Sequence, residues 1–93
     1  MSLKDTLIQK LETQVESWES RLETLRAQFN EYKARADNRE ATEELKEKTA
    51  KRIADLREDI DTARTRLEEL RASGESRLNE LRSKVEDFLN RRS

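Results

Sequence analysis

Apolar residues recur along most of this chain at alternating steps of three and four. The first series is Ile8, Leu11, Val15, Trp18, Leu22, Leu25, Phe29, Tyr32 and Ala36. The second series is Ile53, Leu56, Ile60, Ala63, Leu67 and Leu70, followed by Leu78, Leu81, Val85 and Phe88. Such spacing places one narrow stripe, called the seam below, on one face of an α-helix, and a partner helix must cover that stripe. The pattern predicts an all-α fold of long amphipathic helices in an antiparallel coiled coil.

The seam divides one expected coiled-coil domain, residues 1–93, into four segments. These are a first seam over 3–36, a polar central segment over 37–50, a second seam over 51–72 and a C-terminal amphipathic segment over 75–90. The interval from Ala36 to Ile53 is two heptads plus three residues, and this phase slip favours a turn. Glu44 and Lys48, four residues apart, favour continued helix instead. A helical hairpin and a long unbroken helix, paired in a homodimer or bundle, both fit the pattern.

Residues that cap helices stand at several of these boundaries. Ser2 or Asp5 can cap the first helix, because a short side-chain oxygen accepts a hydrogen bond from a free backbone N–H. Asp37, Asn38 or Thr42 can start a second helix for the same reason.

A further irregularity surrounds Gly74. The step from Leu67 to Leu78 spans 11 residues, which a continuous helix can absorb as a stutter. Gly74 can equally be the C-cap of one helix, with Ser76 starting a last short one. The sequence leaves both alternatives open.

The two seams can be aligned antiparallel with their centre near residue 45. This alignment gives these opposed pairs: Tyr32 with Leu56, and Leu22 with Leu67. It also places Trp18 over the small residues 72–74, and such size complementarity is what close packing needs. We therefore expect Trp18 in the core and expect Gly74→Leu to overpack its surroundings.

Composition excludes a large globular core. Only 32% of the 93 residues are hydrophobic, while 44% are charged. The 20 basic and 21 acidic residues nearly cancel, which is typical of solvated helices rather than of a disordered chain with high net charge. A net charge of −1 also argues against nucleic acid as a partner.

Candidate chemistry is sparse. The chain has neither His nor Cys, so the usual general base and the thiolate metal ligands are missing. The carboxylates lie among Lys and Arg at helical spacing, which indicates exposed ion pairs. We expect no enzyme activity, no catalytic, cofactor-binding or metal site, and no cofactor. With no apolar run of about 20 residues, we expect a cytoplasmic protein.

The sequence resembles small bacterial coiled-coil proteins, some of which are labelled stress-response proteins. The resemblance rests on the opening residues 2–5, on Trp18 within the first seam, on the Glu-, Lys- and Ala-rich middle, and on Ala72-Ser73-Gly74 before a short amphipathic tail. It implies a helical coiled-coil protein and transfers no functional residue to this chain.

We therefore expect a non-enzymatic interaction or structural protein that self-associates, or binds another helical protein, through the seam residues other than alanine. The alternative is a stress protectant or a reversible membrane-surface binder. In that alternative the apolar side of residues 78–89 would lie on lipid, but its polar side mixes acids with bases and favours a partner helix.

Overall fold

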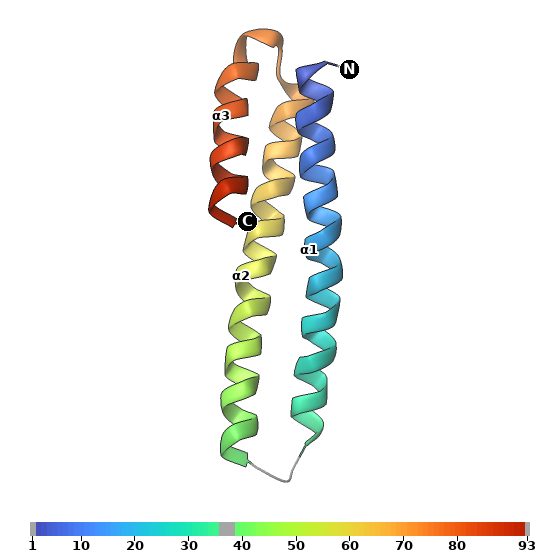
Figure 1. Cartoon of the computed structure of the whole chain (residues 1–93), viewed down its shortest axis with the longest axis vertical. Helices are drawn as coiled ribbons and strands as arrows, with labels where there is room; N and C mark the ends of the chain where they lie inside the picture. The colour runs from blue at the N-terminus through green and yellow to red at the C-terminus, as the bar shows by residue number, and fades with distance from the viewer. Residues whose placement is uncertain (1, 36–38, 93) are drawn as a thin grey trace. The chain divides into compact units, whose positions relative to one another are not determined.

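The computed structural model describes residues 2–35 and 39–92, with the backbone alone at 39–41 and 92. It contains three helices, α1 (Leu3–Ala34), α2 (Arg39–Ala72) and α3 (Glu75–Arg92), shown in Figure 1. No strand occurs among the described residues, and the all-α prediction is confirmed. The alternative of one long unbroken helix is wrong, because α1 ends at Ala34 and Arg35 is not helical.

The N-terminus of α1 is capped by Ser2. Its side-chain oxygen accepts a hydrogen bond from the backbone N–H of Asp5, with 3.2 Å between the two atoms, so Ser2 and not Asp5 is the cap. Of the caps predicted for the second helix, Asp37 and Asn38 lie outside the described residues, as does the seam residue Ala36. Thr42 lies inside α2 and is not a cap.

The helix is interrupted at Ser73 and Gly74, which separate α2 from α3. The carbonyl oxygen of Gly74 accepts a hydrogen bond from the backbone N–H of Arg77 at 3.2 Å, so Gly74 is the N-cap of α3. No described glycine has a positive φ, so Gly74 is not a left-handed C-cap. A Cβ atom at Gly74 would meet nothing within 4 Å. The predicted close packing of Trp18 over Gly74 is therefore wrong, and the overpacking expected from Gly74→Leu loses its basis.

The chain forms two compact units. One consists of Met1–Glu16 and Asp61–Ser93, and we call it the three-helix unit because α1, α2 and α3 all contribute to it. The other is Ser17–Ile60, the two-helix unit, which contains parts of α1 and α2. The buried apolar residues of the three-helix unit are Leu7, Leu11, Val15, Ala63, Leu67, Leu70, Leu81 and Val85. Those of the two-helix unit are Trp18, Leu22, Leu25, Leu56 and Ile60.

Most of the polar central segment is helical, because its residues continue the seam of α2. Buried residues follow one another in steps of seven, which keeps them on one side of the helix: Thr42, Thr49, Leu56, Ala63 and Leu70. Two threonines thus occupy the positions that leucine and alanine hold later. No phase slip occurs after Thr42, and residues 39–50 of the predicted segment 37–50 belong to α2.

Candidate interaction surface

Burial divides the predicted seam residues other than alanine into two groups. The buried group is Leu11, Val15, Trp18, Leu22, Leu25, Leu56, Ile60, Leu67, Leu70, Leu81 and Val85. The half-buried group is Ile8, Phe29, Tyr32, Ile53, Leu78 and Phe88. The half-buried side chains keep part of their apolar surface in contact with water, so a further helix has apolar area to cover.

Sequence reasoning missed three buried residues: Leu7, Thr42 and Thr49. Leu7 lies one position before Ile8, at the margin of a stripe drawn for a single partner helix. In the three-helix unit a second partner helix widens the face that each helix buries. Counting back from Leu56 in steps of seven would have found the two threonines.

Lys4 ties the start of α1 to the end of α2 within the three-helix unit. Its ammonium Nζ donates hydrogen bonds to the carbonyl oxygens of Arg71, at 3.1 Å, and Ser73, at 3.3 Å. The last carbonyls of a helix lack intrahelical partners and carry partial negative charge. Lys4 thus supplies from another helix the cap that a left-handed glycine commonly provides.

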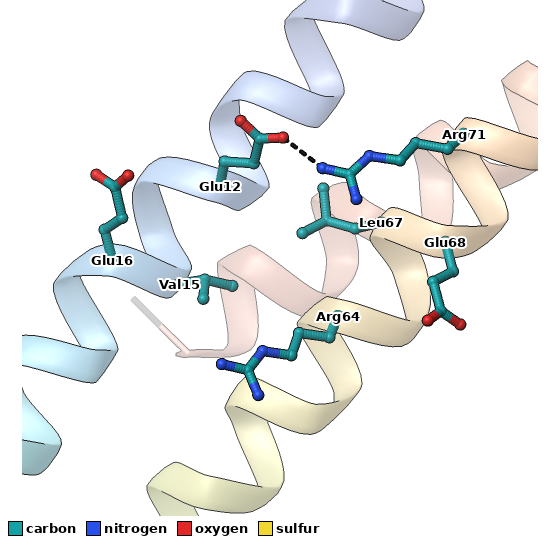
Figure 2. Close-up of a pocket in the computed structure, with 7 residues that line it drawn as sticks. All are labelled: Glu12, Val15, Glu16, Arg64, Leu67, Glu68 and Arg71. Atoms are coloured by element: carbon teal, nitrogen blue, oxygen red, sulfur yellow. Dashed lines mark hydrogen bonds and ion pairs between the residues drawn. The ribbon is translucent and has the colours of Figure 1, made fainter.

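A groove of the three-helix unit lies between α1 and α2, lined by Glu12, Val15, Glu16, Arg64, Leu67, Glu68 and Arg71 (Figure 2). Arg71 Nη2 donates to Glu12 Oε1 at 2.6 Å, and both side chains are about half exposed. An exposed pair of this kind adds little stability. The predicted pairing of Leu67 with Leu22 is wrong, because Leu67 shares this groove with Val15, seven residues earlier on α1.

A groove of the two-helix unit is lined by Leu25 of α1 and Leu56 of α2, and we call it the Leu25–Leu56 groove. The other residues that line it are charged: Arg21, Arg52, Asp55 and Asp59. The predicted partner of Leu56 is Tyr32, which is again seven residues too far along α1. A shift of one heptad keeps every seam residue on the seam, so apolar spacing alone cannot choose between the two registers.

The remaining charged residues offer little chemistry. Several form exposed pairs three or four residues apart on one helix, including the predicted pair Glu44 and Lys48 at 3.1 Å. In the ranges 2–35 and 39–92, no three or more His, Cys, Asp or Glu residues gather where they could hold a metal ion. Across the same ranges no helix has the length and apolarity needed to cross a membrane.

The three helices, with residues buried at heptad spacing, place this chain among all-helical proteins. Its sequence is similar to that of Huntington interacting protein related 1 of Caenorhabditis elegans, with 37% identity over 87 residues. The match covers 91% of this chain and 9% of the relative, so the chain spans less than a tenth of that protein's length. No family model matches the chain, and no solved structure matches it.

Proposed function

We propose that this chain is a non-enzymatic interaction protein, built as an antiparallel coiled coil, that self-associates or binds another helix. The observation that carries the proposal is the burial of residues in steps of seven on both long helices. On α1 these are Leu11, Trp18 and Leu25; on α2 they run from Thr42 to Leu70. Heptad-spaced burial is the signature of helices packed side by side in a coiled coil.

The contacts of the three-helix unit support opposite directions for α1 and α2. Lys4 contacts the carbonyls of Arg71 and Ser73, whereas Val15 shares a groove with Leu67 and Arg64. Residue numbers therefore rise along one helix as they fall along the other.

The two-helix unit supports the interaction role. Phe29, Tyr32 and Ile53 are half buried there, and Leu45 is 41% exposed. Two helices in contact cover only part of each other's apolar surface, so a further helix would bury more of it. The name of the C. elegans relative describes an interacting protein, which is in keeping with this role.

Burial in α3 favours the interaction role over membrane-surface binding. Leu81 and Val85, central to the apolar side of α3, are 1% and 0% exposed. That side is already occupied within the protein, so lipid would have to displace α3 to reach it. The stress-related role and the cytoplasmic location stay predictions from the sequence.

Sedimentation and circular dichroism test the proposal together. We expect full helicity in buffer, no gain with anionic liposomes, and a mass that rises with protein concentration between about 1 µM and 1 mM. A large helical gain only on liposomes would contradict the coiled coil and support the membrane-surface alternative. A mass that stays at one chain across the whole range would contradict self-association.

A further inference from the structure

In the heptad repeat of α2, residues that line the Leu25–Leu56 groove hold the same positions as residues that face α3 in the three-helix unit. There, Thr62 and Arg66 of α2 line a hollow together with Lys84, Asp87, Phe88 and Arg91 of α3. Steps of seven back along α2 lead from Arg66 to Asp59 and Arg52, and from Thr62 to Asp55. These three residues, together with Leu56, form the α2 wall of the groove. Among the described residues of the two-helix unit, only α1 and α2 contribute helix.

The same side of α2 carries the most exposed large apolar residue of the described chain. Leu45 lies seven residues before Arg52 and is 41% exposed. Leu25 and Leu56 line the groove but are only 9% and 7% exposed, so Leu45 is the large apolar side chain that a partner could cover on this side. Apolar area beside a charged rim is the usual composition of a protein interface.

The charges of the groove indicate what covers it. Arg21 and Arg52 are balanced by Asp55 and Asp59, so a strongly basic or strongly acidic partner would meet as much repulsion as attraction. In a contact with a second copy of this chain, the same charged rim lies on both sides. In a twofold contact each surface packs against itself, and every position i that faces j is matched by j facing i.

We propose that the Leu25–Leu56 groove binds the same groove of a second copy of this chain, a proposal that rests on the self-association proposed above. With the twofold axis beside Asp55 and Leu56, the two α2 helices cross in opposite directions. Arg52 then faces the partner's Asp59, and Asp59 faces the partner's Arg52. Asp59 also interacts within its own chain, but a carboxylate has acceptor sites for more than one donor.

Charge reversal tests this pairing. In a homodimer of Arg52→Asp, the new acidic side chain of each chain faces the other chain's Asp59. In a homodimer of Asp59→Arg, the new basic side chain of each chain faces the other chain's Arg52. We expect either variant alone to weaken the dimer by about tenfold or more. An equimolar mixture of the two variants should restore the dimer, because each mixed pair again joins an acid to a base.

Two variants serve as matched controls. Arg57→Asp and Glu58→Arg make the same kinds of charge change at exposed positions of α2 that do not line the groove. We expect both to keep the wild-type dissociation constant. Circular dichroism of every variant shows whether its helices are intact. If one single variant fails to fold, the chain that carries both Arg52→Asp and Asp59→Arg replaces it, because that chain pairs with itself.

The results separate this inference from the broader proposal. Weakening by each variant, with recovery on mixing, supports the twofold pairing. If the wild type forms a dimer and both variants keep its dissociation constant, the pairing is overturned and self-association still stands. The same holds if both variants fold and weaken the dimer but mixing them fails to restore it. A wild-type chain that stays monomeric to about 1 mM overturns self-association and this pairing together, leaving a foreign helix as the occupant.

Discussion

Replacing Leu70 with alanine should lower the free energy of unfolding more than any substitution of an exposed residue. Leu70 is 0% exposed and belongs to the seven-residue series of α2. Removing most of a buried leucine side chain loses its transfer free energy and leaves a cavity, at a combined cost of about 2–5 kcal/mol. With complete burial in the three-helix unit, we expect a loss of about 3 kcal/mol. A chain of this length has a total stability of roughly 5–14 kcal/mol, so the loss is a large fraction.

Leu45→Ala is the matched control, since it makes the same change in the same helix. Leu45 is 41% exposed, so its truncation leaves no closed cavity and removes less buried surface. We expect a cost of about 1 kcal/mol or less. The comparison uses low protein concentration, because Leu45 belongs to the surface that we propose to self-associate.

Urea unfolding and thermal unfolding, each followed by far-ultraviolet circular dichroism and by Trp18 fluorescence, measure both variants. Each 1 kcal/mol shifts the melting temperature by about 4–8 °C for a domain of this size, so Leu70→Ala should lower it by about 12–24 °C. Equal losses from the two variants would refute the assignment of the seam. A loss below about 1 kcal/mol at Leu70 would refute it as well.

Four smaller changes test other features, each by thermal or urea unfolding. Thr49→Val should raise the free energy of unfolding by about 0.5–1 kcal/mol, since it keeps the shape of a buried seam residue and removes its hydroxyl; a loss above 1 kcal/mol would contradict this. Ser2→Ala should cost about 1 kcal/mol by removing the cap of α1, and no change would dismiss the cap. Gly74→Ser should stabilise by a few tenths of a kcal/mol, because serine is the better N-cap and its Cβ meets open space at an ordinary φ; destabilisation would contradict the N-cap assignment. Glu12→Gln should cost about 0.5 kcal/mol at low salt and nothing at high salt, so a cost independent of salt would show that the pair is not solvent-screened.

The sequence predicted which faces of the helices are buried, and the physical reason is simple. A helix returns to the same face every three to four residues, so the spacing of Leu11, Trp18 and Leu25 fixes their common side without knowledge of the partner. All three are buried. The burial of Thr42 and Thr49 follows the same rule, but an apolar pattern gives no signal for threonine.

The partner residues along that face were harder to predict. Moving α1 by seven residues exchanges Leu22 for Val15 and leaves both seams facing each other. Size complementarity between Trp18 and residues 72–74 favoured the wrong register, since Gly74 has open space beside its Cβ position. Two features help to select the register: the end of α1 at Ala34, and the hydrogen bonds of Lys4 to the end of α2. Neither feature belongs to the apolar repeat.

The composition of each unit also indicates where a partner would gain most. The three-helix unit buries Leu11, Leu70 and Val85 completely, each at 0% exposure. The two-helix unit places Thr42 and Thr49 in its buried series and leaves Phe29 half exposed. Each threonine buries less apolar area than a leucine would, so the two-helix unit gains less from its own core. A second copy in the Leu25–Leu56 groove would add burial where the single chain supplies least, and the stability of this unit should therefore rise with protein concentration.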